Sequence, residues 1–422
     1  MAKPGLEARR AAVALLDAVT GDARLLSELL PGAVAHLPEA ERARAQRLAV
    51  ATLRWMDRAD RILGPFLRQR PFLTVHNILR LGVVELAVDR AAAHGVVDSA
   101  VELARGSRDT VRMAGLVNAV LRKVAGDLDR WDRLPLPQLP KWLRRPLVAA
   151  YGKAAVAGIE AAHAAGPALD VTVKPGADWA ARLGGTVLPT GSLRLADGGQ
   201  VSALPGYAEG AWWVQDAAAA IPAKVLNAMP GERVLDMCAA PGGKILQMAA
   251  AGARVTALDL SEARMERLRE NLTRTGLAAD LVVADALQWQ AAAPFDAILL
   301  DAPCSATGTI RRHPDLPYAR DGGGVPRLVA MQSAMLDRAS AMLKPGGRLV
   351  YCTCSLLPEE GEAQIGAVLQ RHSHLAPDAG ALAVPGVDPG WRVPGGLRLR
   401  PDYWPDLGGM DGFFIAALRK AA

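Results

Sequence analysis

The spacing of apolar side chains divides the chain into three stretches. From about residue 6 to 125, apolar residues recur every three or four positions, as at Leu15, Leu16 and Val19, with Arg and Asp between them. This period predicts helices that each bury one face, and therefore an all-α bundle. Breaks between the helices are expected at 31-PG-32, 64-GP-65 and 94-HG-95.

The second stretch begins with the Pro-rich segment 134-LPLPQLPKWLRRP-146, which predicts a linker. Beyond it, candidate strands at 169-LDVTV-173 and 193-LRLA-196 alternate with Gly and Pro turns. We therefore interpret residues 128–215 as a linker followed by a small α+β insert, placed behind a helical domain of residues 1–127.

The third stretch, residues 216–422, alternates strand-like apolar runs with helical patterns such as 261-SEARMERLRENLTRTG-276. The apolar runs are 233-RVLDM-237, 254-RVTALDL-260, 281-LVVAD-285, 295-FDAILLDAP-303 and 347-GRLVYCTC-354. This alternation predicts a doubly wound, Rossmann-like α/β domain with a parallel sheet, and such domains bind ligands at the carboxyl ends of their strands.

Charge separates the front of the chain from the rest. The formal net charge is +6 over 422 residues, with 49 Lys and Arg against 43 Asp and Glu. Residues 1–145 hold 24 of these basic and 16 of these acidic residues, a net of +8, which leaves −2 for the remainder. The excess favours an N-terminal module that faces nucleic acid, although an ordinary Arg-rich surface explains it equally well.

Segment composition also bears on location and metals. No apolar run reaches the roughly 18 residues of a membrane span, and the N-terminus lacks the apolar core of a signal peptide. We therefore expect a cytoplasmic protein without membrane partners. The four cysteines, Cys238, Cys304, Cys352 and Cys354, lack the spacing of zinc ligands, so neither a metal site nor disulfides are expected.

A nucleoside site is predicted in 234-VLDMCAAPGGK-244, which has the pattern of a strand, a turn of small residues and a helix start. Gly242 and Gly243 allow a ligand to approach the backbone, and helix-start amides favour an anionic group. The segment is neither GxGxxG nor a P-loop, which disfavours an NAD-dependent dehydrogenase.

Acids at the ends of several strands strengthen this prediction. Asp259 is placed to accept hydrogen bonds from ribose hydroxyls, and Asp285 lies one strand further on, within reach of a base amino group. Each acid alone is as well explained as a helix cap. Because Asp236 and Asp301 also end strands, a nucleoside pocket explains the set better than capping does.

Cys354 and Cys304 each follow an apolar run. Cys354 precedes a Pro-Glu-Glu helix start, and Cys304 lies beside Asp301 in a tight polar loop. A thiolate is a strong nucleophile, and carbon 5 of cytosine becomes nucleophilic only after a thiolate adds at carbon 6. The pattern therefore indicates covalent chemistry on a pyrimidine, without deciding which thiol attacks. Cys352 is interpreted as a buried structural thiol, and Cys238 as part of the ligand turn.

These motifs resemble the Sun/Fmu family of S-adenosylmethionine-dependent RNA cytosine-5 methyltransferases, in the bacterial branch that acts on small-subunit (16S) rRNA. The matching segments are 215-QDAA-218, 236-DMCAAPGGK-244, 258-LDLS-261, 301-DAPCSATG-308, 311-RRHPD-315, 344-KPGG-347, 353-TCSLLPEE-360 and 411-DGFF-414. The front half is similar to the NusB-like helical domain that this branch carries for RNA binding, through 49-AVATLRWMDRADRIL-63, 76-HNILRLGVVEL-86 and 115-GLVNAVLRK-123.

The resemblance implies a role for each site residue. Cys354 would add to carbon 6 of cytosine, Cys304 would help release the product, and Asp301 would lie between cofactor and substrate. Asp259 would hold the ribose of S-adenosylmethionine and Asp285 its adenine. Its methionine and sugar side would be held by the turn that comprises Cys238, Ala239, Ala240, Pro241, Gly242, Gly243 and Lys244.

Three positions depart from the family pattern, namely Ala306 in place of a Gly, Ile245 in place of a hydroxyl residue and Gly361 in place of an Asn. The rival interpretations are a DNA cytosine-5 methyltransferase with Cys304 as nucleophile, methylation of another RNA, and a non-catalytic RNA-binding or ribosome assembly factor. One copy of each site favours a monomer.

Overall fold

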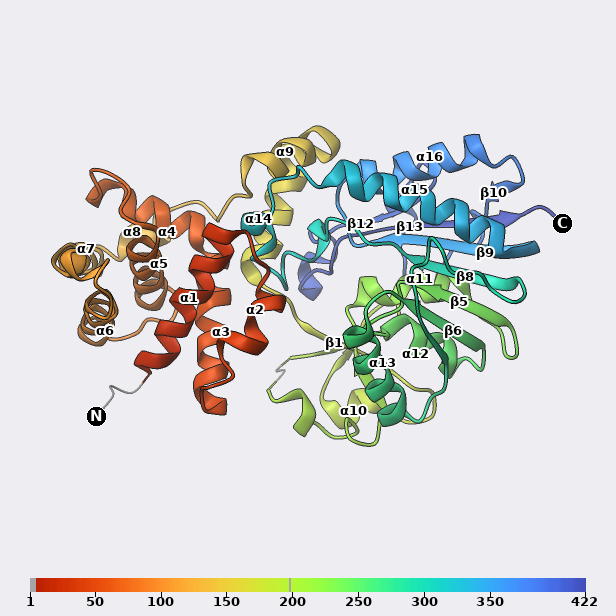
Figure 1. Cartoon of the computed structure of the whole chain (residues 1–422), viewed down its shortest axis with the longest axis horizontal. Helices are drawn as coiled ribbons and strands as arrows, with labels where there is room; N and C mark the ends of the chain where they lie inside the picture. The colour runs from red at the N-terminus through yellow and green to blue at the C-terminus, as the bar shows by residue number, and fades with distance from the viewer. Residues whose placement is uncertain (1–4, 197–198) are drawn as a thin grey trace. The chain divides into compact units, whose positions relative to one another are not determined.

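The computed structural model describes residues 5–196 and 199–422 (Figure 1). By their internal contacts, these residues form two compact units. The first comprises the chain up to Ala165 together with Ile310–Asp321, and the second comprises Gly166–Thr309 and Gly322–Ala422. The chain therefore leaves the second unit and returns to it within the segment that follows Cys304.

The first unit is helical, as predicted. Its helices are α1 (Leu6–Asp22), α2 (Leu26–Ala33), α3 (Glu39–Arg54), α4 (Met56–Leu63), η1 (Gly64–Phe66), α5 (Leu73–Ala87), α6 (Ala93–Arg105), η2 (Val111–Met113), α7 (Ala114–Ala125), α8 (Asp129–Arg133), α9 (Lys141–Ala165) and α14 (Leu316–Ala319). The apolar positions that predicted the bundle, such as Leu15, Leu16 and Val83, form its core.

Three predictions for this part of the chain are wrong in detail. The expected break at 31-PG-32 lies inside the last turn of α2, and the helix ends only at Ala33. The expected break at 94-HG-95 falls inside the first turn of α6, because the chain bends earlier, at residues 88–92. The Pro-rich segment predicted as a linker also contains the start of α9, which begins directly after Pro140 and is interrupted at Gly152, where φ is 81°. Proline is tolerated near a helix N-terminus because the first amides have no partner within the helix.

Residues of Ile310–Asp321 are bound closely to the helices of the first unit. The carboxylate of Asp315 accepts a hydrogen bond from the amide of Leu26 at 2.9 Å. The indole of Trp142 donates to the carbonyl of Pro317 at 3.0 Å. Tyr318 packs against the core of the bundle, in which Ala319 is buried. This segment thus completes a hydrophobic core that begins some 300 residues earlier in the chain.

The second unit contains two sheets. The smaller sheet is antiparallel, in the order β2-β3-β1-β4. Its elements are β1 (Leu169–Val173), α10 (Trp179–Leu183), β2 (Thr186–Val187), β3 (Leu193–Leu195), η3 (Val201–Ala203) and β4 (Trp212–Val214). Arg194 and Asp170 form a buried ion pair at 2.7 Å across β3 and β1. The two segments expected to be strands between residues 147 and 215 are therefore confirmed as strands.

The larger sheet has the order β11-β12-β13-β9-β8-β5-β6-β7, and β10 pairs with β13. Its strands are β5 (Arg233–Met237), β6 (Arg254–Asp259), β7 (Asp280–Val283), β8 (Phe295–Asp301), β9 (Leu343–Thr353), β10 (Leu375–Pro377), β11 (Arg392–Val393), β12 (Gly396–Leu399) and β13 (Phe413–Lys420). The five strands from β9 to β7 are parallel, as predicted, whereas β10 to β13 are antiparallel and were not predicted.

Helices cover both faces of this sheet (Figure 1). The helices of the second unit are α11 (Ala217–Leu226), α12 (Gly243–Ala250), α13 (Glu262–Thr275), η4 (Thr307–Thr309), α15 (Val325–Met342), η5 (Pro358–Glu360), α16 (Glu362–Arg371), η6 (Pro389–Trp391) and η7 (Pro405–Leu407). Ile221, Ile245 and Leu268 bring α11, α12 and α13 into one core. Leu336 and Ile365 bring α15 and α16 into the core on the opposite face. Among the described residues, no helix is both long and apolar enough to cross a membrane.

Candidate active site

The structure brings the two predicted thiols together. Asp301 ends β8, and it lies in register with Cys352 on the parallel neighbour β9. The loops that follow these two strand ends carry Cys304 and Cys354, whose Sγ atoms are 3.4 Å apart. Because parallel strands end at the same edge of a sheet, two residues 50 positions apart in sequence reach one place.

A lysine and a third cysteine hold Asp301. Lys244 donates from Nζ to Oδ2 of Asp301 at 2.7 Å, and Cys352 donates from Sγ to Oδ1 at 3.4 Å. Lys244 is only 9% exposed. Burial acts to lower the pKa of Lys244, but the neighbouring Asp301, aided by Asp236, raises it above its ordinary value. The sequence interpretation of Cys352 as a structural thiol did not anticipate this contact.

The surroundings of Cys304 disfavour its thiolate form. Its hydrogen bond with Cys354, together with its burial and the nearby charge of Glu360, raises the pKa of Cys304 well above its usual range. A thiolate whose pKa is raised is a stronger base, so Cys304 holds a proton firmly once it has accepted one.

Glu360 is a buried acid that the sequence interpretation treated only as a favourable residue at a helix start. Its side chain accepts hydrogen bonds from the amide and hydroxyl of Ser305 at 2.9 and 2.5 Å, and from the hydroxyl of Ser355 at 2.6 Å. These partners come from both cysteine loops. No local signal in the sequence reveals such a bridge, because it joins residues 55 positions apart.

The glycine turn has a tightly packed backbone. Gly242 has a φ of 110°, and a Cβ atom at this position would lie 2.3 Å from Cδ1 of Leu268. The next residue, Gly243, begins α12, and Gly242 offers that helix no side-chain cap. The first amides of α12 thus remain available to an anionic group of a ligand.

Asp236, one residue before the end of β5, is the strongest indication of a position for a cationic ligand group. Its side chain is 1% exposed, and neither carboxylate oxygen has a hydrogen-bond partner among the described residues. Burial and the neighbouring carboxylates of Asp301 and Asp259 raise its pKa well above the ordinary value, although Lys244 opposes this. A buried carboxylate without a partner is costly, so a cationic ligand group beside it would be strongly favoured. The α-ammonium group of S-adenosylmethionine has this chemistry, and the residues present therefore fit that cofactor.

The two acids predicted to contact ribose and adenine, Asp259 and Asp285, accept hydrogen bonds from nearby backbone amides. Asp259 accepts hydrogen bonds from the amides of Ala240 at 3.1 Å and Ser261 at 3.0 Å. Asp285 accepts one from the amide of Leu287 at 2.9 Å. Each carboxylate oxygen can accept more than one hydrogen bond, so these contacts leave room for a ligand. The predicted contacts with ribose and adenine stay predictions.

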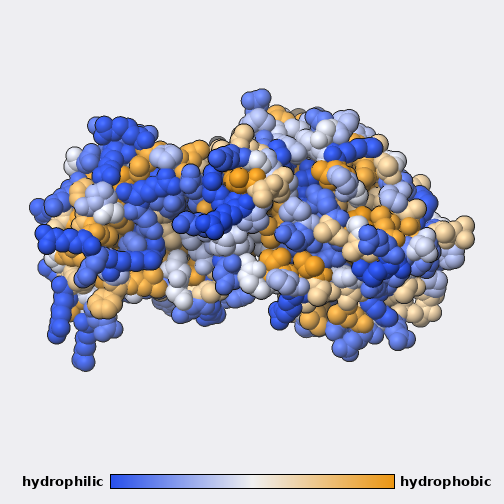
Figure 2. Space-filling model, turned by 90° about the horizontal axis from the view of Figure 1, so that it is seen from above, coloured by the Kyte–Doolittle hydropathy of each residue, from blue (hydrophilic) through white to orange (hydrophobic). Residues whose placement is uncertain are grey.

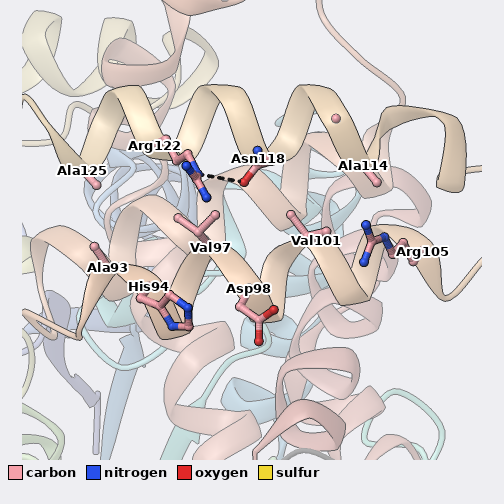
Figure 3. Close-up of a pocket in the computed structure, with 11 residues that line it drawn as sticks. Ala93, His94, Val97, Asp98, Val101, Arg105, Ala114, Asn118, Arg122 and Ala125 are labelled. Atoms are coloured by element: carbon pink, nitrogen blue, oxygen red, sulfur yellow. Dashed lines mark hydrogen bonds between the residues drawn. The ribbon is translucent and has the colours of Figure 1, made fainter.

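A groove in the first unit lies between α6 and α7, which run antiparallel (Figure 3). It encloses about 530 Å³. Val97 and Val101 form its apolar floor, and His94, Arg105 and Arg122 contribute basic or titratable side chains. Arg122 donates to the side-chain oxygen of Asn118 at 3.1 Å. On the face seen in Figure 2, long hydrophilic side chains project from the first unit, which occupies the left of the view.

Two family models match the chain. A model described as 16S rRNA methyltransferase RsmB/F matches residues 223–419, and a NusB family model matches residues 6–126. The chain is 36% identical to Ribosomal RNA small subunit methyltransferase B of Pseudomonas putida and 34% identical to the protein of the same name from Vibrio cholerae. Each comparison covers 98% of this chain and 98% of the relative. The chain belongs to this methyltransferase family.

Solved structures agree with the fold. PH0851 superposes with a TM-score of 0.72 over 100% of both chains at 22% sequence identity. A methyltransferase homologue from Pyrococcus horikoshii gives a TM-score of 0.55 at 28% identity, over 67% of this chain and 95% of the homologue. The predicted resemblance, the NusB-like helical domain and the Rossmann-like methyltransferase fold are thus confirmed. S-adenosylmethionine is the methyl donor of the family, and small-subunit rRNA is its substrate.

Proposed function

We propose that the protein methylates carbon 5 of a cytosine in 16S rRNA through a covalent bond between Cys354 and carbon 6 of that base. The observation that carries this proposal is the pair of thiols 3.4 Å apart at neighbouring strand ends, beside the Asp301–Lys244 pair. Carbon 5 and carbon 6 are bonded neighbours in the pyrimidine ring. Two thiols with separate tasks at these two atoms must therefore lie close together.

The proposed sequence assigns a task to each side chain. The thiolate of Cys354 forms a bond to carbon 6, and the displaced electron pair makes carbon 5 nucleophilic. S-adenosylmethionine supplies the methyl group as an electrophile. The deprotonated sulfur of Cys304 then accepts the proton of carbon 5 and becomes a thiol, while the electron pair of that C–H bond restores the ring double bond and expels the thiolate of Cys354.

The acidic and basic groups nearby have supporting roles in this proposal. Asp301, fixed by Lys244 and Cys352, is placed to accept a hydrogen bond from the amino edge of cytosine. Asp236 would hold the ammonium group of the cofactor, with the turn from Cys238 to Lys244, Asp259 and Asp285 around the rest of that molecule.

The first unit is proposed to bind rRNA. Its basic balance and the arginines at the α6–α7 groove support this role, because phosphate contacts supply most sequence-independent affinity. A cytosine in a loop or single strand would then be extruded toward the site that contains the thiols.

Labelling with tritiated S-adenosylmethionine tests the proposal. Wild-type protein, Cys354→Ala and Cys304→Ala are each incubated with unmodified 16S rRNA and separately with DNA oligonucleotides. We expect 5-methylcytosine in RNA with wild type, none with Cys354→Ala, and an RNA adduct that survives a denaturing gel only with Cys304→Ala.

The rival outcomes are distinct. Methylation by Cys354→Ala would make Cys304 the nucleophile, as in DNA cytosine-5 enzymes. Label in DNA would favour the DNA enzyme. RNA binding by wild type without any transfer of label would identify an assembly factor.

A further inference from the structure

Glu360 is fully buried, with 0% of its surface exposed, and lies at the end of η5. A buried carboxylate requires several donors to replace its hydration. One oxygen accepts from the amide of Ser305 at 2.9 Å and from the side-chain amide of Gln332 at 3.0 Å. The other accepts from the hydroxyls of Ser305 and Ser355 at 2.5 and 2.6 Å.

The positions of these partners in the sequence are informative. Ser305 directly follows Cys304, and Ser355 directly follows Cys354. One carboxylate thus joins the residue after the first thiol to the residue after the second. Two further hydrogen bonds connect the same loops. The amide of Gly308 donates to the carbonyl of Cys354, and the amide of Leu356 donates to the side-chain hydroxyl of Thr307, both at 2.9 Å.

We propose that Glu360 is a positioning residue that sets the separation of Cys304 and Cys354 by bridging Ser305 and Ser355. The role rests on the proposed function, in which the two thiols act on adjacent atoms of one base. Glu360 does not touch the substrate, because its donors all come from within the protein and its side chain is buried. It acts through the two serines, each of which is covalently attached to a catalytic cysteine.

The chemistry of the bridge predicts a graded series of variants. Gln has the length of Glu, and serine hydroxyls can turn to accept as well as donate, so Glu360→Gln should keep much of the bridge. Glu360→Ala removes it. Glu359 is the exposed neighbour with the same charge, so Glu359→Ala is a matched control for the loss of one carboxylate in this turn.

Thiol cross-linking measures the separation without any RNA. The full-length protein and its variants are treated with a bis-alkylating bimane, and the Cys304–Cys354 cross-linked peptide is quantified by mass spectrometry. Small displacements of reacting groups cost large factors in rate, so we expect cross-linking to fall about tenfold or more in Glu360→Ala. Glu360→Gln should lose much less, and Glu359→Ala should match wild type.

A second measurement separates positioning from folding. Cofactor affinity is measured with S-adenosylhomocysteine, whose proposed contacts do not include Glu360, and it should be unchanged in every variant. Wild-type cross-linking in Glu360→Ala with intact affinity would overturn the proposal. If Glu360→Ala fails to bind the cofactor analogue, Ser355→Ala is used instead, because it removes one of the two serine hydroxyls that Glu360 binds. Wild-type cross-linking in Ser355→Ala would also overturn the proposal.

Failure of the proposed reaction and failure of the positioning role give different results. If wild type makes no 5-methylcytosine although Glu360→Ala shows the expected loss of cross-linking, the proposed reaction is wrong and Glu360 still sets the separation of the two thiols. If wild type makes 5-methylcytosine and Glu360→Ala cross-links normally, only the positioning role fails.

Discussion

At the scale of single residues, the sequence identified candidate reactive side chains but not the contacts that hold them. Both predicted thiols and Asp301 meet at one sheet edge, as a parallel sheet requires. The partners that constrain them, Lys244 and Glu360, were placed in the ligand turn and at a helix start instead. Their roles depend on contacts between distant segments, and these contacts carry no period or local motif.

Ala306, which the sequence marks as a departure from the family glycine, has a φ of 57° in the structure. A left-handed backbone costs a residue with a Cβ atom roughly 1–2 kcal/mol, and a glycine gives back about 0.4–1 kcal/mol through the greater entropy of its unfolded chain. We therefore expect Ala306→Gly to stabilise the protein by up to about 1 kcal/mol in urea unfolding.

The matched control is Ala330→Gly, at an exposed position within α15, which should destabilise the protein by about 1 kcal/mol. The same chemical change thus has opposite signs at the two positions. A loss of stability in Ala306→Gly would show that the loop does not keep this backbone conformation.

Replacing Asp236 is expected to stabilise the cofactor-free protein but to weaken cofactor binding. Its pKa is raised in the folded protein, so it adds stability that is fully present below its ordinary pKa of 3.8 and is lost as the pH rises through the folded value. Asp236→Asn should therefore stabilise the cofactor-free protein at pH 8 by about 1 kcal/mol or more, with no gain near pH 3.

The same variant should lose most of the stabilisation that S-adenosylmethionine confers, because its amide cannot neutralise a cation. Thermal unfolding with and without the cofactor at pH 8 measures both effects. Undiminished stabilisation by the cofactor in Asp236→Asn would mean that this carboxylate faces something other than the ligand.

At the scale of elements, the apolar pattern predicted all five strands of the parallel part of the sheet within a few residues. The antiparallel strands β10 to β13 were missed. Three of them, β10, β11 and β12, are only two to four residues long, and irregular stretches separate β10 from β11 and β12 from β13. In the segment 411-DGFF-414 a motif was recognised, but the strand that begins there at Phe413 was not. Short edge strands are stabilised by their partners rather than by their own pattern.

The α6–α7 groove leads to a prediction about RNA affinity. If Arg105 and Arg122 each contact a phosphate, Arg105→Gln and Arg122→Gln should each reduce the slope of log affinity against log salt concentration by about one. Filter binding of a 16S rRNA fragment over a range of salt concentrations measures the slope. Arg133→Gln, which changes an exposed arginine outside the groove lining, is the control and should leave the slope unchanged.

Affinity changes in both groove variants without any change in slope would indicate that these arginines shape the groove rather than neutralise phosphates. A slope change in Arg133→Gln alone would place the RNA elsewhere on the first unit.

At the scale of the whole molecule, the first unit contains a buried histidine that should make it sensitive to acid. His163 is buried, and neither of its ring nitrogens has a hydrogen-bond partner among the described residues. Burial, with the charges of Arg311 and Arg54, lowers its pKa to about 3. Glu160 lines the same small cavity and is itself bound by Arg144.

Because folding lowers the pKa of His163 from its ordinary value of 6.5, the neutral imidazole stabilises the folded protein above pH 6.5. This stabilisation is lost as the pH falls toward 3. The free energy of unfolding should therefore decrease by roughly 2 kcal/mol between pH 6.5 and 5. His163→Gln should flatten this dependence, whereas His36→Gln, at an exposed position of the same unit, provides the background. An unchanged pH dependence in His163→Gln would assign the acid sensitivity to other groups.

The overall division of the chain was the least predictable feature. The composition and the spacing of apolar residues indicate a helical N-terminal part and an α/β C-terminal part. Nothing local indicates that Ile310–Asp321 joins the front, since the segment follows a cysteine loop of the α/β domain and resembles an ordinary connection. Tyr318 and Ala319 pack with the core of the N-terminal helices, and Asp315 accepts a hydrogen bond from the amide of Leu26. These contacts make the segment part of the first unit.

This return crossing has a consequence for biosynthesis. During translation the helices of the first unit emerge from the ribosome well before Ile310–Asp321, because residues 166–309 must be made in between. Until then the nascent bundle lacks Tyr318 and Ala319 in its core, and the amide of Leu26 lacks the carboxylate of Asp315. The N-terminal bundle thus begins to fold first but completes its fold only when much of the methyltransferase domain has been synthesised.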